Sequence, residues 1–296
     1  MKQAERGFLL LTSHLGDPES KPLTVAQFRT LIQRMQNVQK KEESRDLELE
    51  DLYGLGYGQE FAENILSLLH RQEQLDYYVN QGAKWDCYPI TRISSLYPAV
   101  LRNKLGQDCP GSLWAKGDSS LLSRPAVSLV GSRDLFPENE NFAREVGRQA
   151  AKQGYVLVSG NARGADQTAQ ESCLEYGGQV ISIVADSLQK CKDRPGVLYL
   201  SEDGWNCGFS TVRAHSRNRL IHAMGALTLV AQCSNGKGGT WKGTEQNLHH
   251  HWSPVFCFQD GSQAVRELIQ MGANFVDIFD LTEFSTLHND NISLFD

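Results

Sequence analysis

The feature that most constrains the fold is a regular alternation of short apolar runs and helical stretches in the second half of the chain. Strand-like runs occupy residues 126–130, 155–158, 180–184, 197–200, 227–230 and 255–258. Helical patterns lie between several of them, at about residues 141–153, 166–175, 217–224 and 244–250. Such alternation is typical of a mostly parallel sheet with helices on both faces. The sequence therefore predicts an α/β, Rossmann-like, doubly wound domain at residues 125–280.

The rest of the chain divides into a helical region, a connector and a tail. Apolar residues recur at helical spacing at Phe28, Leu31, Ile32 and Met35, and again at Ile65, Leu68 and Leu69. We expect a small helical domain at residues 1–80, a connector packing on the Rossmann-like domain at 81–124, and a tail at 281–296. The charged segment 40–51 is expected to be a solvated helix face or a linker.

Composition excludes several classes of protein. No run of about 18 apolar residues is present, so no membrane span is expected, and the N-terminus lacks the long apolar region of a signal peptide. The seven cysteines include no C-x-x-C pair, which argues against a disulfide framework or a zinc site and favours the cytoplasm. The net charge of −6 means that nucleic-acid binding would require a local basic patch.

Function is expected in the loops after the strands, because doubly wound sheets bind ligands at the carboxyl ends of their strands. The first loop is Gly131-Ser132-Arg133, where glycine allows a sharp turn and arginine can hold a phosphate. A strand-ending turn with a solvated arginine explains it equally well. The second loop is Ser159-Gly160-Asn161-Ala162-Arg163-Gly164, followed by Asp166 as a helix cap. Neither loop matches a dinucleotide fingerprint or a Walker A motif.

A third candidate segment is rich in arginine. Arg213, Arg217, Asn218 and Arg219 lie in a stretch without acidic residues, which favours an anion-binding role. Arg217 and Arg219 are two residues apart and cannot share one face of a helix. We expect one of them to reach the ligand and the other to form an ion pair.

A fourth segment, residues 235–245, is expected to be a flexible loop rich in hydrogen-bond donors. Its candidate ligand-binding residues are Lys237, Gly239, Thr240 and Lys242. Trp241 offers a face on which a base could stack. The alternative is a mobile surface loop whose tryptophan packs on its own domain.

The residues give little support for a metal, a cofactor or catalysis. His249, His250 and His251 would point about 100° apart on a helix and could not chelate one ion. No Ser–His–Asp arrangement has the setting of a nucleophile elbow. We therefore expect a binding protein without a metal or cofactor rather than an enzyme.

Six segments of the chain, taken in order, resemble the DNA-processing protein A (DprA/Smf) family. They are residues 127–133, 159–166, 177–184, 201–202, 217–221 and 268–273. The resemblance covers about residues 90–280. It implies an extended Rossmann fold that binds single-stranded DNA, forms a homodimer and delivers the DNA to a RecA-type recombinase during natural transformation. It also implies that Arg133 lies in the DNA pocket and that Arg217-Asn218-Arg219 borders it.

The chain departs from the family pattern at several positions. Ala214-His215-Ser216 stands where the family usually has Phe-Pro, and residues 238–244 replace a usual Ser-Gly-Ser-Leu-Ile-Thr. Gln232 replaces a common glutamate and Gln170 a usual histidine. The chain thus resembles a divergent member without a winged-helix tail.

Two other functions remain open at this level. The first is suggested by Gly238-Gly239 and Gly243-Thr244-Glu245, which echo the Gly-Gly-x-Gly-Thr-x-x-Glu motif of LOG-type nucleoside-monophosphate phosphoribohydrolases with altered spacing. The second is a sensor that holds a free nucleotide in the same pocket. Separately, residues 52–58 resemble a helix-hairpin-helix turn, whose N–H groups can contact phosphates. A plain helical hairpin explains that segment equally well.

Overall fold

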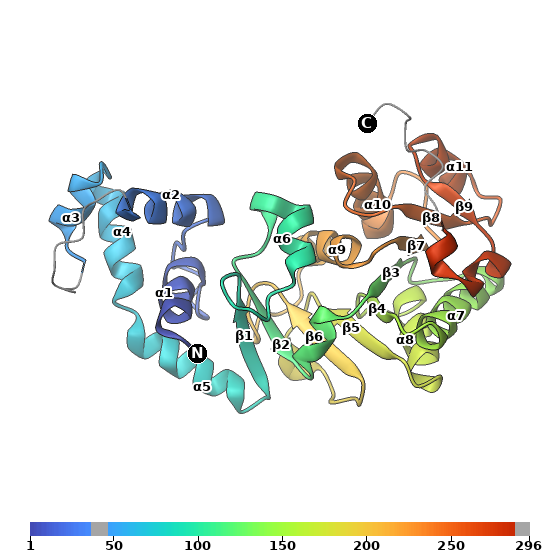
Figure 1. Cartoon of the computed structure of the whole chain (residues 1–296), viewed down its shortest axis with the longest axis horizontal. Helices are drawn as coiled ribbons and strands as arrows, with labels where there is room; N and C mark the ends of the chain where they lie inside the picture. The colour runs from blue at the N-terminus through green and yellow to red at the C-terminus, as the bar shows by residue number, and fades with distance from the viewer. Residues whose placement is uncertain (37–46, 288–296) are drawn as a thin grey trace.

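The computed structural model describes residues 1–36 and 47–287. Within these ranges, a nine-stranded sheet forms the centre of the molecule and a group of helices lies at one end (Figure 1). The strands are β1 (Cys87–Thr91), β2 (Ser112–Lys116), β3 (Ala126–Val130), β4 (Val156–Ser159), β5 (Gln179–Ile183), β6 (Val197–Ser201), β7 (Thr228–Val230), β8 (Val255–Phe258) and β9 (Asn274–Val276). Part of the charged segment 40–51 and most of the expected tail 281–296 lie outside the described residues.

The helices fall into an N-terminal group and a group that covers the sheet. The first group is α1 (Gln3–Thr12), α2 (Val25–Gln36), α3 (Leu49–Gly54), α4 (Gln59–Leu69) and α5 (Gln72–Ala83). The second is α6 (Ala99–Leu105), α7 (Pro137–Lys152), α8 (Ala165–Glu175), α9 (Thr211–Met224), α10 (Gly238–His250) and α11 (Gln263–Gln270). Short 3₁₀ turns are η1 (Gly106–Asp108), η2 (Ser119–Ser123), η3 (Leu188–Lys190), η4 (Ile278–Thr282) and η5 (Phe284–Thr286). No described helix has the length and apolar character needed to cross a membrane.

The strand order is β1-β2-β6-β5-β4-β3-β7-β8-β9. Strands β3 to β9 pair in parallel with one another, whereas β2 pairs antiparallel with both β6 and β1 at one edge. From β3 the chain winds outward through β4, β5 and β6, and later through β7, β8 and β9 on the other side. The predicted doubly wound, mostly parallel fold is therefore confirmed. The winding reverses between β3 and β7, and a crevice for a ligand is expected there.

The segment 81–124 is part of the sheet rather than only a layer upon it. Its strand β2 pairs with β1 through Ile90 and Leu113, and with β6 through Trp114 and Ser201. Of the three prolines in this segment, Pro98 immediately precedes α6, Pro110 lies between η1 and β2, and Pro89 lies inside the edge strand β1, where a missing N–H donor is tolerated.

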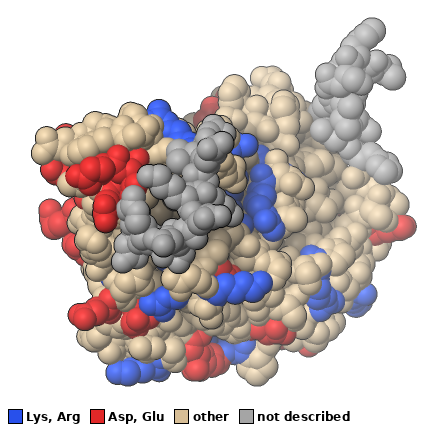
Figure 2. Space-filling view, turned by 60° about the vertical axis from the view of Figure 1, so that its left-hand side comes forward, with Lys and Arg blue, Asp and Glu red and all other residues tan. Residues whose placement is uncertain are grey.

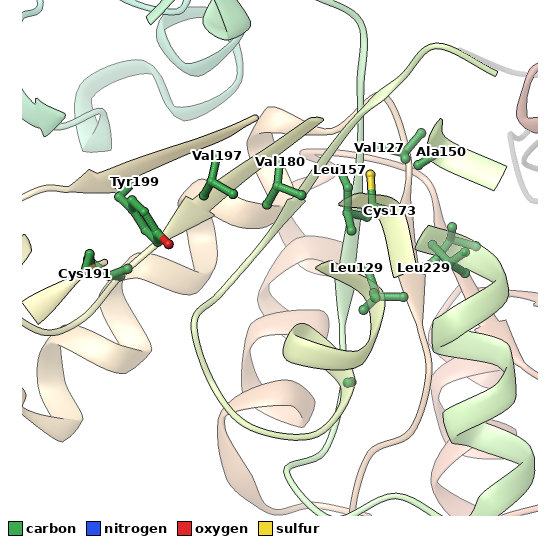
Figure 3. Packing of buried hydrophobic residues seen from close by; sticks show 14 of the residues in the cluster. Val127, Leu129, Ala150, Leu157, Cys173, Val180, Cys191, Val197, Tyr199 and Leu229 are labelled. Atoms are coloured by element: carbon green, nitrogen blue, oxygen red, sulfur yellow. The ribbon is translucent and has the colours of Figure 1, made fainter. Parts of the chain in front are cut away.

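Each face of the sheet has its own apolar core, because alternate residues of a strand point to opposite faces. Val127 and Leu129 of β3 lie with Leu157, Val180 and Leu229 on one face, together with Ala150 of α7 and Cys173 of α8 (Figure 3). The other face buries residues of α6, α9, α10 and α11, among them Leu101, Leu220, Trp241 and Leu268.

The N-terminal helices enclose a separate apolar cluster and also join the sheet. Leu52, Ile65 and Leu68 are buried in that cluster. Tyr78 of α5 forms the joint, with its ring centroid 5.1 Å from that of Trp114 and 5.4 Å from that of Trp205. Its hydroxyl donates a hydrogen bond of 2.6 Å to Asn206 Oδ1.

One local prediction was wrong. Residues 238–243, expected in a flexible loop, form the first turns of α10. A Cβ on Gly243 would lie 3.1 Å from Asn218 Cβ and 3.2 Å from His222 Nε2. The glycine therefore lets α10 pack closely on α9, and this packing outweighs the poor helix propensity of glycine. Strand β9 was not anticipated, because it has only three residues.

Candidate functional site

The main cavity, about 550 Å³, opens at the carboxyl ends of β3 and β7, where the winding reverses. A second cavity of about 380 Å³ shares Arg133, Phe209 and Arg217 with it. A third, of about 210 Å³, shares His215, Asn218 and Gly239 with the first. We call these three connected cavities the groove.

The loops after β3 and β4 interlock beneath the groove. A Cβ on Gly131 would lie 2.4 Å from Ala165 Cβ, and one on Gly164 would lie 2.4 Å from the Arg133 carbonyl oxygen. Gly164 also has a φ of +79°, a conformation that favours glycine. The Ala165 N–H donates to the Ser132 carbonyl oxygen at 3.1 Å. These two glycines are therefore required by close packing, and the floor that they form is rigid.

Arg217 places a nearly buried cation at the centre of the groove. Its side chain is 12% exposed, and its Nη1 donates to the Ile183 carbonyl oxygen at 3.1 Å. Its Nη2 lies 3.9 Å from Asp166 Oδ2, beyond hydrogen-bond distance, and its buried Nε has no hydrogen-bond partner among the described residues. Burial lowers the pKa of Arg217 and raises the pKa of Asp166. Because arginine stays protonated nonetheless, Arg217 is an incompletely compensated charge suited to an anion.

Three predicted residues, Ser159, Gly160 and Gly164, do not line the groove. A Cβ on Gly160 would lie 1.7 Å from Arg217 Nη1, so the guanidinium occupies the space that only glycine leaves free. The Ser159 hydroxyl is buried and accepts a hydrogen bond of 2.7 Å from Gln170 Nε2. Gly164 belongs to the interlocked loops described above. Gln170, which stands where the family usually has histidine, also donates to the Gly160 carbonyl oxygen and so ties the loop to α8.

Arg133 and Lys237 line the main cavity and add exposed positive charge to it. Neither has an ion-pair partner in the described part of the chain. Helix α10 begins beside Lys237, and its first residues Gly238 and Gly239 line the cavity. Its first turn carries no acidic residue. A helix N-terminus of this kind favours an anion, through both its free N–H groups and its dipole.

The other two arginines of the third segment stabilise the protein itself. Arg213 contacts Asp203 at 2.5 Å and donates to the carbonyl oxygens of Cys207 and Gly208, each at 2.7 Å. Arg219 Nη2 lies 2.7 Å from Glu202 Oε2. Arg219 thus forms the ion pair that the sequence predicts for one of the two arginines, whereas Arg217 lines the main cavity.

The third cavity holds the remaining predicted residues. It is lined by Asn218, Arg219, Gly239 and Lys242. Arg219 Nη1 is buried without a hydrogen-bond partner in the described ranges, whereas Asn218 Nδ2 donates to the Gly239 carbonyl oxygen at 3.0 Å. Thr240 lines the main cavity, but its hydroxyl is directed to the Gly131 carbonyl oxygen at 2.9 Å.

The aromatic side chain of the groove is Phe209, not Trp241. Trp241 is 6% exposed and belongs to the core beneath α10, so the expected stacking role is wrong. Phe209 is 56% exposed and lines the first and second cavities. The sequence motifs do not identify Phe209, because it lies four residues before Arg213. It is therefore upstream of Ala214-His215-Ser216, where the family usually has Phe-Pro. The feature that could have identified it is a single aromatic residue in the stretch Asn206–Ser210, whose other residues are small or polar.

Local charge in this molecule departs from its net charge of −6. On the face shown in Figure 2, acidic side chains gather toward the left edge and basic ones lie nearer the centre. The groove is lined by three carboxylates, Asp134, Asp166 and Asp186, and by six cations, Arg133, Arg163, Arg217, Arg219, Lys237 and Lys242. Asp186 is engaged by Lys190 at 3.0 Å. The uncompensated charge at the centre of the groove is therefore positive.

A closely packed floor, a buried arginine and a helix N-terminus at the switch point define a Rossmann-type protein whose groove is suited to an anion. A family model described as DNA recombination-mediator protein A matches residues 89–286, well over half of the chain. The chain therefore belongs to the DNA recombination-mediator protein A (DprA/Smf) family, as the sequence motifs predict.

Characterised relatives agree with this assignment. DNA processing protein DprA of Streptococcus pneumoniae is 28% identical over 206 residues, covering 64% of this chain and 68% of that protein. DprA of Bacillus subtilis is 26% identical over 221 residues, covering 69% and 72%. Among solved structures, the S. pneumoniae protein superposes with a TM-score of 0.69 at 23% identity, over 95% of this chain and 98% of that one.

A second solved structure, of DNA processing protein A from Helicobacter pylori, has a TM-score of 0.54 at 24% identity. It covers 66% of this chain and 92% of that one, and it concerns the single-stranded DNA binding mode of the H. pylori protein. At these identities, the two superpositions support the fold.

Proposed function

We propose that this chain binds single-stranded DNA in the groove. The observation that carries the proposal is Arg217, a cation held 12% exposed with a carboxylate 3.9 Å away and an unused buried nitrogen. A phosphate oxygen in the main cavity, which Arg217 lines, would compensate the charge of its guanidinium. Family membership and the single-stranded DNA binding mode of the H. pylori protein support the choice of ligand.

The strand would be held chiefly through its backbone. Arg133 and Lys237 line the main cavity, and the N-terminus of α10, which begins directly after Lys237, presents N–H groups to it. These groups recognise phosphate, which every nucleotide carries, so sequence preference is expected to be weak. Lys242 in the third cavity would contact a neighbouring phosphate.

Phe209 would supply the contact to a base. Its exposed ring lies at the boundary of the first and second cavities, beside Arg133 and Arg217. Stacking of a base on an aromatic ring tolerates any sequence and excludes a paired duplex, whose bases are already stacked. The combination of backbone cations with one aromatic ring favours a single strand.

Binding is expected to serve a partner. Delivery of the strand to a RecA-type recombinase, and homodimerisation, follow from the resemblance to the family. Support for an interface comes from Met271, Phe275 and Phe279, which are 42%, 48% and 84% exposed near the last strand of the sheet. Phe279→Arg should reduce the molar mass measured by light scattering if these residues form the dimer contact.

The decisive experiment is fluorescence anisotropy of a labelled oligothymidylate at two salt concentrations. Arg133→Glu should weaken binding roughly tenfold to a hundredfold, because a charge-assisted hydrogen bond is worth about 1.5–3 kcal/mol. Binding by the native chain should weaken as salt rises, because counterions are released from the DNA.

Arg144→Glu is the matched control, because Arg144 lies on α7 outside the groove and pairs with Glu140 at 3.2 Å. It should bind the oligonucleotide as the native chain does. Equal losses in the two variants would attribute the effect to overall charge. No binding by the native chain at low salt would contradict the proposal.

The groove also suits a free nucleotide, since 550 Å³ lies in the range of small-ligand cavities. A nucleotide sensor would show thermal stabilisation by nucleotides without DNA binding. The phosphoribohydrolase alternative has less support, because Glu245 is exposed and lines none of the three cavities of the groove. Release of adenine from AMP by the protein would support that alternative.

A further inference from the structure

An ion pair spans the mouth of the groove between the loops after β3 and β4. Arg163 Nη2 lies 2.9 Å from Asp134 Oδ1 and donates to Oδ2 at 3.2 Å. Asp134 lines the first cavity and Arg163 the second, so the pair bridges them. The side chains are 68% and 84% exposed, for Arg163 and Asp134 respectively, and water reaches both.

The loop that carries Asp134 is held by a different residue. Gln232 Nε2 donates to the Asp134 carbonyl oxygen at 3.1 Å, and Gln232 Oε1 accepts from the Phe136 N–H at 2.9 Å. A glutamate at position 232 could not donate the first of these bonds. The backbone of Asp134 is thus fixed independently of Arg163, and its carboxylate remains beside the groove when Arg163 moves.

We infer that Asp134 withholds the charge of Arg163 from an anionic strand in the groove and thereby lowers the affinity for DNA. This inference rests on the proposed function, because it concerns the same groove. Arg133 and Lys237 have no ion-pair partner in the described ranges, so they are available to phosphate from the start. A phosphate that approaches Arg163 must first displace a carboxylate.

The expected size of the effect follows from the exposure of the pair. Exposed ion pairs change an equilibrium constant by a factor of roughly 1.4 to 5. Asp134 therefore adjusts affinity without abolishing binding. Arg163, although predicted as a DNA-binding residue, should contribute little while Asp134 is present.

The test measures anisotropy of a labelled oligothymidylate across a salt series. Asp134→Asn should tighten binding roughly two- to fivefold. It should also steepen the slope of log K against log salt by about 0.7, the value of one added phosphate contact on a single strand. Asp134→Ala should give at least the same gain, because it also removes the amide oxygen that asparagine could offer to Arg163.

Epistasis with Arg163 separates this role from simple charge removal. Arg163→Gln alone should change the Kd less than about twofold, but it should abolish the gain from Asp134→Asn. Asp186→Asn is the matched control, because Asp186 lines the second cavity while its partner Lys190 does not line the groove. Its smaller gain should persist when Arg163 is replaced.

Three results would decide the matter. Equal gains from Asp134→Asn and Asp186→Asn, or a gain from Asp134→Asn that survives Arg163→Gln, would overturn the inference while leaving DNA binding intact. Failure of the native chain to bind any oligonucleotide would instead remove the proposed function, and the inference with it. Circular dichroism of each variant establishes that it is folded.

Discussion

Two glycine-rich turns of the described chain, before α10 and before α4, differ in the charges around them. Gly236, Gly238 and Gly239 lie at the start of α10, where Arg217 and Lys237 face a common cavity. Gly54, Gly56 and Gly58 lie before α4, whose first turn contains Glu60. The cavity beside α4, about 600 Å³, is lined by both Lys21 and Glu60. A glycine turn thus supplies geometry, and the surrounding charges decide whether an anion is favoured.

Gly236 and Gly238 resemble Gly56 in having a positive φ, but two other glycines of the groove meet a different constraint. Gly160 and Gly243 face atoms that a side chain would overlap or crowd. Gly54 and Gly58 have nothing within 4 Å of an added Cβ, and Gly56 is constrained by its φ of +81°. In the groove, glycine makes room for Arg217 and for the packing of α10 on α9. Near α4 it serves the backbone of the turn.

The largest expected effect comes from Gly160→Ala. The added methyl group would displace the Arg217 guanidinium, which should weaken oligothymidylate binding at least tenfold, the value of a lost charge-assisted contact of about 1.5–3 kcal/mol. The free energy of unfolding should fall by about 1–3 kcal/mol. Anisotropy and urea unfolding measure the two. Native-like binding by this variant would show that Arg217 does not contact the strand.

A smaller loss is expected from Phe209→Ala, about 1–3 kcal/mol of binding free energy for one lost stacking contact. The salt dependence should not change, because no phosphate contact is removed. An oligonucleotide with abasic sites should bind the native chain and the variant equally. Tyr53→Ala is the control, since Tyr53 is 42% exposed beside the turn before α4. A comparable loss from this control would mean that the turn before α4 contributes to DNA binding as much as the groove does.

The cores behind the two helices should differ in their response to pH. Behind α10, burial lowers the pKa of His222 from 6.5 to about 3, and its Nδ1 lies 3.2 Å from Asn247 Nδ2. The folded protein keeps this histidine neutral, so its contribution to stability is complete above pH 6.5 and decreases as the pH falls toward 3. The loss is about 1.4 kcal/mol per pH unit.

Urea unfolding of His222→Gln across this range tests that expectation, because the variant should show a flatter pH dependence than the native chain. Ile65→Val, in the apolar cluster behind α4, should instead lower the free energy of unfolding by about 0.5–1.5 kcal/mol at every pH. An unchanged pH dependence in His222→Gln would mean that His222 is not the titrating group.

The smallest effects belong to the turn before α4. Gly58→Ala and Lys21→Gln should change the affinity for single-stranded DNA less than about twofold, and the free energy of unfolding by no more than about 0.5 kcal/mol. A marked loss of binding, measured by anisotropy beside Gly160→Ala, would show that the helix-hairpin-helix-like turn contacts DNA after all. The two regions would then share a function.

The fold could be predicted because its signal is repeated. Apolar runs of four or five residues alternate with helical stretches, and each adds support to the same parallel sheet. Two cations of the groove could also be predicted, since Arg133 follows a strand and Arg217 lies in a segment without acidic residues. The start of α10 could not be predicted, because its four glycines are typical of a loop. The contacts of Gly243 with Asn218 and His222, which favour the helix, exist only in the folded protein.

Contacts between side chains that are distant in the sequence could not be predicted either. Nothing local indicates that Arg163 meets Asp134, which lies 29 residues earlier. The sequence predicts Arg213 as a ligand-binding residue, but in the structure it donates to the carbonyl oxygens of Cys207 and Gly208. Phe209 gains its exposure from the loop that Arg213 holds. Such relations arise from tertiary packing, which a single sequence does not reveal.

The interlocked glycines beneath the groove have a kinetic consequence. Because Gly131 and Gly164 leave the loops after β3 and β4 no room to shift, the protein does not have to rearrange its floor when a strand arrives. Encounter should then be governed by diffusion and by electrostatic attraction to Arg133 and Lys237. Variants that remove contacts within the groove should differ from the native chain in how long the strand stays bound, more than in how fast it arrives.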